Sequence, residues 1–504
     1  MSGARTPSVG TGASRTDRGD SLTAVEAGGS TLRSTWIDPG GDGTLQPGPG
    51  EPLVDRTKLG PVEPVGDELA CLAHLTDAHI VDASSPARVP FLARLGPPVQ
   101  STFRPQEVLS AQILHGAINA VRAFGPDLVI QGGDLIDNAQ SNELAPALTL
   151  LNGGTVHPGS GPDGYHGVQL ASNPDPAYYR PDIDAPRHPG LLGHAVMPFT
   201  SPGLGCPWIP VLGDHDALVA GELVPDQVTR ALAVGDRALW SMPENLALPT
   251  GLKLSGGSSP DGPLDPSFVA AFLEQALAGR TVQVPPDARR AELELRELIE
   301  QLWTGSHAAA QVELSASGPT GARERLDYVR DVGDRLRLIV LDALRRDGGS
   351  GGVVHDDQPE WLEEQLATAG DRWVIVITHQ PLENLSGGER LFSLLDRSPR
   401  VVAALAGHTH RNRIIARETV TGGYWLITTC SLIDFPQQCR ALRLLESASG
   451  GVALQTWMLD HTGNGSLGPI ARELSYLDAQ NDRWIHLSGR QRDRNATLFR
   501  QAAS

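Results

Sequence analysis

The chain has 504 residues and a formal net charge of −18, which results from 59 acidic and 41 basic side chains. With 40% hydrophobic and 20% charged residues, the composition is typical of a globular protein with a sizeable core and excludes a chain that is disordered throughout. The negative charge is spread along the sequence and repels polyanions and anionic membrane surfaces, so we expect no nucleic-acid partner.

The sequence shows no sign of membrane insertion or secretion. No run approaches the roughly 20 apolar residues that cross a bilayer, and residues 1–60 lack the apolar stretch of a secretory signal. We therefore expect a cytoplasmic protein without a membrane span. Cys71, Cys206, Cys430 and Cys439 show no paired spacing of the C-x-x-C type, which favours free and mostly buried thiols.

The chain changes character after residue 60. Residues 1–60 are rich in Gly, Ser, Thr and Pro without a period of 2 or 3.6, which predicts a flexible arm or one held only by contacts with the body. A buried strand is predicted from Ala70, where an apolar run leads into polar residues. A helix over 105–124 and a short buried strand over 127–131 follow. This order implies a parallel strand pair with a helical crossover.

The same alternation recurs farther along the chain. Four apolar runs predict strands and one periodic segment predicts a helix, the strands at 208–212, 336–341, 373–377 and 401–406 and the helix at 358–369. Two long insertions, at about 139–205 and 235–335, interrupt this core, and the second contains an amphipathic, charged helix near 287–303. Insertions of this size usually build a lid or a substrate wall. We expect one domain over 61–460 and a polar C-terminal extension over 461–504.

Five short segments carry Asp or His directly after a predicted strand. They are Asp77-Ala78-His79, Gly133-Asp134-Leu135-Ile136-Asp137-Asn138, Gly213-Asp214-His215-Asp216, His379 and Gly407-His408-Thr409-His410. In open α/β sheets, ligands bind at the carboxyl ends of the strands. Each segment alone is more often a turn or a helix cap. Five of them in order, each at a strand end, predict a single metal site.

The spacing within these segments suits metal binding. Ligands at positions i and i+2 of extended backbone point to the same side, so Asp77 with His79, and His408 with His410, can each present two donors. Mixed carboxylate and imidazole ligands favour Mn, Fe or Zn. The neighbouring glycines let the backbone turn tightly beside the ions.

The five segments together resemble the signature of the calcineurin-like metallophosphoesterase superfamily, which runs D-x-H, G-D-x-x-D, G-N-H-D, H and G-H-x-H. The likeness covers roughly residues 70–460. The segments GGDLIDNAQ and VLGDHDALVAGE are similar to an actinobacterial-type branch of that superfamily. The resemblance implies an α/β fold, a four-layer α-β-β-α sandwich of two mixed sheets with the site at the sheet ends. It also implies an enzyme that hydrolyses phosphate esters.

The resemblance implies a role for each motif residue. Seven would ligate two metal ions, namely Asp77, His79 and His410 the first, Asp214, His379 and His408 the second, and Asp134 both. His215 would lie near the leaving-group oxygen as a proton donor or a phosphate-binding group. Three further residues would orient the ligands or His215, namely Asp137, Asn138 and Asp216. The implied cofactors are two divalent or trivalent ions (Mn, Fe or Zn), with a hydroxide between them that attacks phosphorus.

One position departs from the superfamily pattern. Asp214 stands where G-N-H-D has Asn. A carboxylate still ligates through one oxygen, but it adds a negative charge. This charge affects the metal preference and the catalytic activity of the second site.

The most direct interpretation is a hydrolase of phosphomonoesters or small phosphodiesters, cyclic nucleotides included. A nuclease of the same superfamily is one alternative, but the acidic balance and the lack of an Arg/Lys stripe disfavour it. A catalytically weak metal-binding scaffold is another, although every expected ligand position holds a competent side chain. Substrate specificity would reside in the two insertions, which match no motif.

Other histidines and tyrosines favour structural roles. His74 lies inside the first strand and is expected to face the core. Tyr165, Tyr178 and Tyr179 are expected to pack within the first insertion. Isolated histidines are expected at the surface or in hydrogen bonds, namely His115, His157, His166, His188, His194, His307 and His461.

Overall fold

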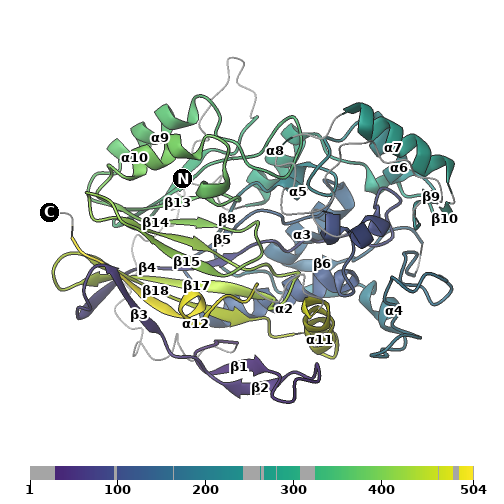
Figure 1. The fold of residues 1–504 in the computed structure, drawn as a ribbon, viewed down its shortest axis with the longest axis horizontal. Helices are drawn as coiled ribbons and strands as arrows, with labels where there is room; N and C mark the ends of the chain where they lie inside the picture. The colour runs from purple at the N-terminus through teal and green to yellow at the C-terminus, as the bar shows by residue number, and fades with distance from the viewer. Residues whose placement is uncertain are drawn as a thin grey trace, which may run out of the picture.

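The computed structural model describes residues 29–502 apart from 96–98, 163, 242–261, 263–265, 280, 307–323, 464 and 481–486. Within this part of the chain, two large mixed sheets form the centre of the molecule, and helices lie outside them (Figure 1). The sequence-based expectation of a mixed α/β protein is confirmed. The exact four-layer sandwich and the role of the two insertions remain predictions.

The first sheet has seven strands in the order β3-β19-β18-β17-β4-β5-β8. Their bounds are β3 (Val54–Leu59), β4 (Val65–Leu75), β5 (Leu128–Gln131), β8 (Trp208–Pro210), β17 (Gln438–Ser447), β18 (Val452–Asp460) and β19 (Ala496–Arg500). Strands β4, β5 and β8 run parallel, whereas β17 pairs antiparallel with both β4 and β18. The parallel part brings three successive strand ends to one edge of the sheet.

The second sheet has six strands in the order β11-β12-β13-β14-β16-β15. Their bounds are β11 (Tyr328–Val332), β12 (Leu336–Val340), β13 (Trp373–Ile377), β14 (Val401–Ala406), β15 (Arg413–Arg417) and β16 (Tyr424–Thr428). Strands β12, β13, β14 and β16 are parallel, and β11 and β15 close the edges antiparallel. The continuous apolar runs of β13 and β14 are buried throughout, as expected for parallel strands covered on both faces.

Helices flank the sheets. The longer ones are α2 (Ser110–Phe124), α3 (Ser141–Asn152), α7 (Pro266–Ala278), α8 (Leu295–Gly305), α9 (Gln358–Ala367) and α11 (Leu467–Ala479). The shorter elements are β1 (Ser34–Ile37), β2 (Gln46–Pro49), β6 (Gly154–Val156), β7 (Phe199–Ser201), β9 (Arg237–Ala238), β10 (Val282–Gln283), α4 (Leu191–Ala195), α5 (Asp214–Ala217), α6 (Gln227–Val234), α10 (Gly388–Leu395) and α12 (Gln491–Arg494).

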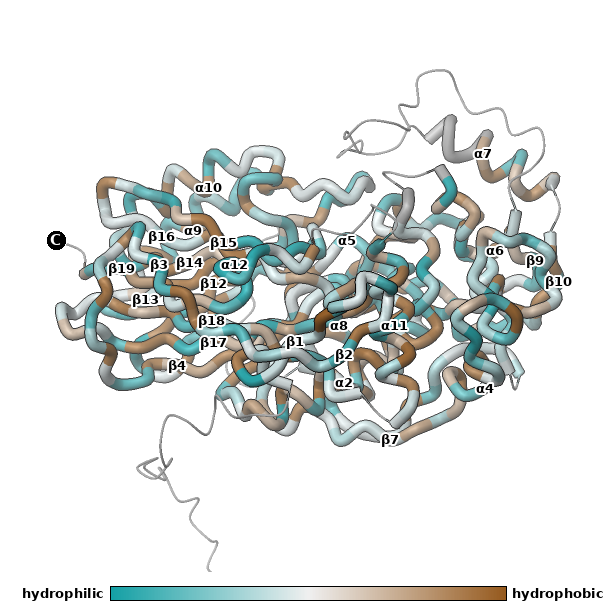
Figure 2. Tube along the Cα trace, turned by 60° about the horizontal axis from the view of Figure 1, so that its bottom comes forward, coloured by the Kyte–Doolittle hydropathy of each residue, from teal (hydrophilic) through white to brown (hydrophobic). Residues whose placement is uncertain are grey.

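One large apolar core joins the two sheets. It contains Leu72 and Leu442 from the seven-stranded sheet together with Leu338 and Ile375 from the six-stranded sheet. The opposite face of the six-stranded sheet packs against α9 and α10 in a second cluster, and α2 packs against β17 and β18 on the outer side of the first sheet. In the hydropathy view, much of the hydrophobic colour lies on interior segments near β13, β14 and α8 (Figure 2).

Several predicted elements are present with small shifts of their ends. The predicted helix over 105–124 begins later, at Ser110, and the helix expected near 287–303 is α8, which ends at Gly305. Among the described residues, no disulfide links the four cysteines, and Cys71, Cys430 and Cys439 are buried, as expected. Among the described residues, no helix combines the length and the apolar character that a membrane span requires.

Strand pairing with the body holds both ends of the described chain, which is the second of the two possibilities expected for the arm. Residues 1–28 of the predicted N-terminal arm lie outside the described residues. The part of the arm that follows is not a loose segment, because β3 pairs in parallel with β19. β19 itself is fully buried and pairs with β18 on its other side, so the supposed polar extension also completes the sheet. Strand pairing with distant partners, rather than local periodicity, stabilises both segments.

The second predicted insertion contains a buried carboxylic acid that makes stability depend on pH. Thr229 Oγ1 donates a hydrogen bond of 2.8 Å to Glu292 Oε2, while Oε1 has no partner among the described residues. Burial raises the pKa of the Glu292 carboxyl from 4.5 to about 7. The folded chain therefore holds this proton more tightly than the unfolded chain. Its contribution to stability is present below pH 4.5 and is lost as pH rises through about 7.

We expect Glu292→Gln to remove this pH-dependent loss. Between about pH 5 and pH 8, the free energy of unfolding of the variant should rise relative to wild type by about 2 to 3 kcal/mol. Chemical denaturation at both pH values measures it. Glu300→Gln on the exposed side of α8 is the matched control and should follow wild type. Identical pH dependence in wild type and Glu292→Gln would contradict the prediction.

Candidate metal centre

All five predicted motif segments meet at adjoining strand ends. β4 ends just before Asp77, β5 before Asp134, β8 before Asp214, β13 before His379 and β14 before His408. Three of these strands belong to the seven-stranded sheet and two to the six-stranded sheet. The structure thus brings together residues from both sheets that lie more than 300 positions apart, such as His79 and His410.

The backbone of these segments adopts an unusual conformation. Among the described residues, eight other than glycine have positive φ, and five of them are predicted ligands, with φ of 54° at Asp77, 43° at His79, 49° at Asp134, 63° at His408 and 55° at His410. The left-handed conformation costs an L-residue roughly 1 to 2 kcal/mol. Such strain concentrates at functional sites, where surrounding contacts impose it.

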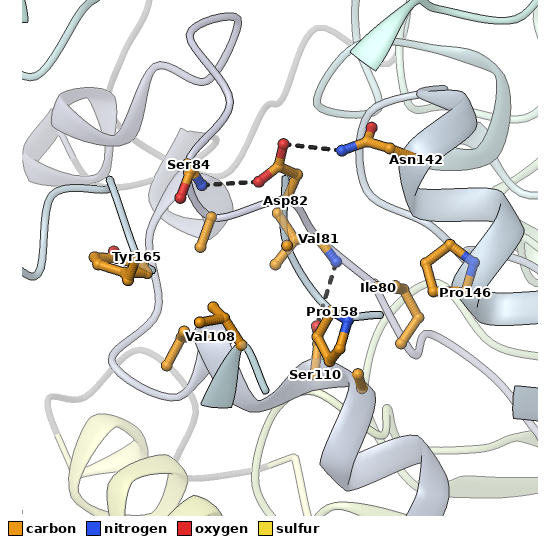
Figure 3. Close-up of a pocket in the computed structure, with 14 residues that line it drawn as sticks. Ile80, Val81, Asp82, Ser84, Val108, Ser110, Asn142, Pro146, Pro158 and Tyr165 are labelled. Carbon is orange, nitrogen blue, oxygen red and sulfur yellow. Dashed lines mark hydrogen bonds between the residues drawn. The ribbon is translucent and has the colours of Figure 1, made fainter. Parts of the chain in front are cut away.

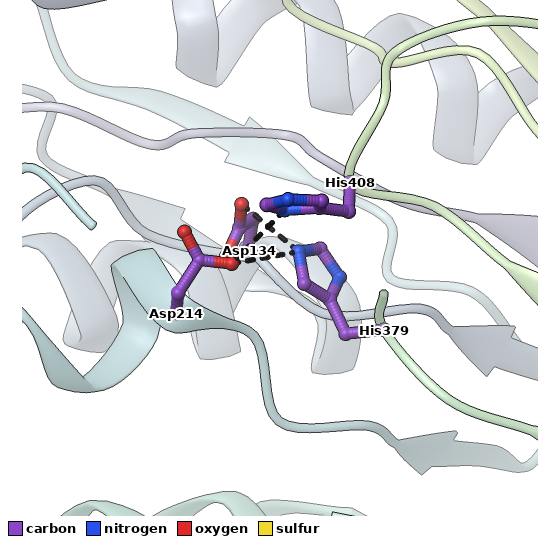
Figure 4. A group of neighbouring side chains, drawn as sticks. All are labelled: Asp134, Asp214, His379 and His408. Carbon is purple, nitrogen blue, oxygen red and sulfur yellow. Dashed lines mark ion pairs between the residues drawn. The ribbon is translucent and has the colours of Figure 1, made fainter. Parts of the chain in front are cut away.

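One cluster comprises Asp134, Asp214, His379 and His408, whose candidate ligand atoms lie within 4.8 Å of one another. His379 Nε2 lies 3.1 Å from Asp134 Oδ2 and 3.3 Å from Asp214 Oδ1, and His408 Nδ1 lies 3.1 Å from Asp214 Oδ1. Figure 4 shows the two carboxylates and the two rings pointing toward one another. This is the set expected for the second metal position.

A second cluster comprises Asp77, His79 and His410. His410 Nε2 lies 3.3 Å from Asp77 Oδ1 and 3.2 Å from His79 Nε2. Asp134 links the two clusters, because its Oδ2 lies 3.7 Å from His79 Nε2 as well as close to His379. The placement matches the set expected for the first position, with Asp134 between the two.

The donor set fits a pair of metal ions. Asp214 Oδ2 and His379 Nε2 are buried without a hydrogen-bond partner among the described residues, a costly arrangement for polar atoms unless a ligand satisfies them. Three aspartates and four imidazoles supply oxygen and nitrogen donors without thiolates, which suits Mn, Fe or Zn. A shared carboxylate between two clusters is suited to bridge two ions.

Hydrogen bonds to the far side of the rings orient two of the histidines. His379 Nδ1 lies 2.8 Å from the carbonyl oxygen of Gly132, and His79 Nδ1 lies 2.9 Å from Asp137 Oδ1. A carbonyl oxygen only accepts, so Nδ1 of His379 carries the hydrogen and Nε2 presents a lone pair to the cluster. Ligating histidines in metalloproteins are held in this way.

His215 lies beside both clusters. Its backbone N–H donates to Asp134 Oδ1 at 2.9 Å, and its Nδ1 lies 3.0 Å from the carbonyl oxygen of Asp137. Its ring meets the ring of His79 edge-on, with 4.5 Å between centroids. Burial alone would lower the pKa of His215, but the charges of Asp134 and Asp137 outweigh it and raise this pKa to about 10. The two carboxylates therefore favour the protonated form of the ring.

Asp216 and Asn138 support the loops rather than the clusters directly. Asp216 accepts hydrogen bonds from the backbone N–H groups of Leu135 (2.8 Å) and Gly213 (2.9 Å), which ties two motif segments together. Asn138 Nδ2 donates to Asp137 Oδ2 at 3.1 Å. Asn138 thus contacts the carboxylate that holds His79, whereas Asp216 acts through the backbone.

Sequence reasoning missed three side chains around the clusters. Gln380 Nε2 donates to Asp214 Oδ1 at 3.0 Å, and Asp434 Oδ2 lies 2.6 Å from His410 Nδ1. Glu143 accepts from the backbone N–H groups of Asn138 (2.8 Å) and Asp137 (3.2 Å). Asp434 follows the buried strand β16, so the strand-end rule applied to that strand would have found it. Nothing in the local sequence distinguishes Gln380 or Glu143.

Among the residues expected to have structural roles, Tyr165 and Tyr178 are buried, Tyr179 is partly buried, and His157 and His194 are exposed. His74 is fully buried, with Nδ1 2.9 Å from Thr429 Oγ1, and burial lowers its pKa to about 3. The Tyr178 hydroxyl donates to the Trp240 carbonyl at 2.7 Å, and the Tyr179 hydroxyl to the Pro186 carbonyl at 2.6 Å. His307 lies outside the described residues.

A small pocket lies along the loop that follows His79. It is lined mainly by apolar and small side chains, including Val108 and Pro158, together with Asp82 and Asn142 (Figure 3). Asp82 accepts from Asn142 Nδ2 at 2.9 Å and pairs with Arg290 at 2.9 Å. Its carboxylate is thus fully engaged in holding the fold, and the pocket contains none of the clustered ligands.

Two curated proteins match a short stretch of the chain. The glycerophosphodiester phosphodiesterase GpdQ of Enterobacter lignolyticus is 33% identical over 84 residues, which are 15% of this chain and 30% of that protein. The probable glycerophosphodiester phosphodiesterase GpdQ of Arcobacter nitrofigilis is 34% identical over 87 residues, 15% of this chain and 32% of that protein. The resemblance to the metallophosphoesterase superfamily is confirmed. The chain spans about a third of the length of these curated relatives.

Two solved structures overlap loosely with this chain. A dimetal phosphatase from Danio rerio gives a TM-score of 0.38 at 13% identity, covering 78% of this chain and 97% of that one. The structure of PhoD gives 0.32 at 12% identity, covering 88% and 80%. Overlaps of this size carry no argument about function. No protein-family model matches the chain.

We expect Asp134→Ala to remove both metal ions. The carboxylate between the clusters has no substitute, and its loss leaves two cations facing each other with less compensating charge. Elemental analysis of the purified protein should show metal content falling from two ions per chain toward none. Asp55→Ala on the exposed side of β3 is the control. Retention of two ions by Asp134→Ala would refute the bridging assignment.

We expect Asp214→Asn to weaken the binding of one metal ion only. The amide keeps one ligating oxygen but removes a negative charge, and metal affinity depends on the charge of the ligand set, so we expect about tenfold weaker binding or more. Titration of the metal-free protein with Mn²⁺ should show one affinity reduced and the other unchanged. Two unchanged affinities would show that Asp214 is not a ligand.

Proposed function

We propose that this chain is a dinuclear metal-dependent phosphoesterase that hydrolyses phosphomonoesters or small phosphodiesters. The observation that carries the proposal is the convergence of seven predicted ligands into two buried clusters that share Asp134. The short matches to phosphodiesterases support the same reaction class. The net charge of −18 favours a small ester over a long polyanion.

We assign the first ion to Asp77, His79 and His410 and the second to Asp214, His379 and His408, with Asp134 shared. When bound, the two ions would lower the pKa of a water molecule and neutralise charge on the phosphate. The two mixed sheets, with helices outside each, are consistent with the four-layer arrangement of the superfamily. We further propose a single catalytic unit over 54–500, because β3 and β19 complete the first sheet.

His215 is the proposed proton donor to the leaving-group oxygen. Asp134 and Asp137 fix its backbone and Nδ1 at one side of the clusters, and their charges favour the protonated ring. Its side chain is 12% exposed, so the ring is largely shielded but reachable from solvent. A protonated imidazole in this position can donate a proton as the ester bond breaks.

A reconstitution screen tests the proposed function. The protein is stripped of metal, reloaded with Mn, Fe or Zn, and assayed against mono-, di- and cyclic phosphate esters with metal content measured in parallel. Metal-dependent turnover of at least one class supports the proposal. Failure to hydrolyse any of these esters while two ions are bound would favour a binding role instead.

His215→Ala should separate proton donation from phosphate binding. We expect retained metal and a rate loss of about 10²-fold or more for an ester with a poor alcohol leaving group, but a smaller loss for a nitrophenyl ester that needs no protonation. The kcat values of both substrates measure the difference. His194→Ala on the exposed side of α4 is the control. Equal losses with both esters would indicate that His215 binds phosphate.

A further inference from the structure

A buried carboxylate outside the motifs holds the ring of His410. Asp434 lies in the loop between β16 and β17 and is 1% exposed. Its Oδ2 lies 2.6 Å from His410 Nδ1. A hydrogen on Nδ1 donates to this carboxylate and leaves the lone pair on Nε2, which faces Asp77 Oδ1 at 3.3 Å. The carboxylate therefore selects the ring tautomer that can ligate.

A buried arginine from a distant part of the chain holds the same carboxylate. Arg104 precedes α2, and its Nε donates to Asp434 Oδ1 at 2.8 Å. Its Nη1 donates to the carbonyl oxygen of Ser101 at 2.9 Å, which fixes the guanidinium. Each oxygen of Asp434 thus has one strong donor, and the carboxylate cannot rotate without losing both.

The loop that contains Asp434 also contacts the backbone of another ligand. The N–H groups of Leu432 and Ile433 both lie 3.2 Å from the carbonyl oxygen of Asp77. Gln106 Nε2 donates to the carbonyl oxygen of Ile433 at 3.2 Å. The segment before α2 and this loop together support the first cluster.

The second cluster is supported differently. His379 Nδ1 faces the carbonyl oxygen of Gly132, a backbone group without net charge. Asp214 accepts from the neutral amide of Gln380. Within the described residues, the buried ion pair of Arg104 and Asp434 therefore contacts a histidine of the first cluster and none of the second.

We propose that Asp434 and Arg104 are positioning residues that fix the tautomer and orientation of His410, and that they thereby set the affinity of the first metal position. The proposal rests on the dinuclear site of the proposed function. It goes beyond that site because neither residue ligates an ion or belongs to a motif. Among the described residues, the side-chain hydrogen bonds of Arg104 reach Asp434 and Ser101 and no ligand, so its contact with the site runs through Asp434.

The test is a titration of the metal-free full chain with Mn²⁺, with the variants Asp434→Asn and Arg104→Gln. The side-chain amide of Asp434→Asn has one oxygen that accepts and one NH₂ group that donates. If the oxygen accepts from His410, the NH₂ group faces the N–H of Arg104, so either the contact with His410 or the contact with Arg104 is lost. We expect one of the two Mn²⁺ affinities to fall by about 10- to 100-fold while the other stays within about twofold. Arg104→Gln should lower the affinity for the same ion.

The double variant tests whether the two residues act in series. Because Arg104 acts through Asp434, the double variant should bind Mn²⁺ no more weakly than Asp434→Asn alone. The ¹⁵N signals of histidine rings supply a readout without metal. In the metal-free chain, at a pH where the ring of His410 is neutral, the hydrogen should stay on Nδ1 in wild type and no longer do so in Asp434→Asn. Asp460→Asn is the matched control, since Asp460 is also buried but bonds Gln438 instead of a histidine.

The outcomes separate this proposal from the proposed function. If wild type fails to bind two ions, the proposed function fails. If wild type binds two and Asp434→Asn binds both with unchanged affinity, the positioning role is wrong and the dinuclear site stands. An equal loss of affinity for both ions in Asp434→Asn would also overturn the positioning role. Should Asp434→Asn lose its cooperative melting transition, the same criteria apply to Arg104→Gln.

Discussion

The burial of several carboxylates at one place is the constraint on which the rest of the structure depends. Asp77, Asp134 and Asp214 are all almost completely removed from solvent. Taking an ionised carboxylate out of water costs several kcal/mol unless cations and hydrogen bonds compensate. The imidazoles, the backbone N–H groups and the two sheet edges are arranged to supply that compensation, and a pair of metal ions would complete it. The motif segments have a strained left-handed backbone, and the same surrounding contacts offset its cost.

The sequence revealed the chemistry better than it revealed the architecture around it. Apolar runs that end in Asp or His are local signals, so the strand ends of β4, β5, β13 and β14 and their polar residues could be predicted. β3 and β19 could not be, because their stability comes from pairing with strands distant in sequence. For a similar reason, the side chains that hold the ligands of the clusters were not predicted. Gln380 and Glu143 act through contacts that no periodicity reports, although Asp434 follows a strand end as the motifs do.

The two clusters share a bridging carboxylate but differ in their surroundings. The first is supported by an ion pair from two distant loops, whereas the second is supported by neutral groups and itself contains the additional carboxylate of Asp214. Each cluster thus has one carboxylate of its own, Asp77 or Asp214, and the first has the further carboxylate of Asp434 behind His410. This difference gives the two positions distinct electrostatic characters even though their donor atoms are similar.

The position of β4 in the first sheet also has a consequence during synthesis. β4 pairs with β17, so that Glu68 and Arg443 contact each other although they are 375 positions apart. At typical elongation rates, roughly 20 to 75 s pass between the appearance of the two strands. Throughout that interval the apolar end of β4 lacks its partner on one side, and such an unpaired edge is prone to aggregation. The first sheet therefore stays incomplete at β4 for most of the time that the chain is being made.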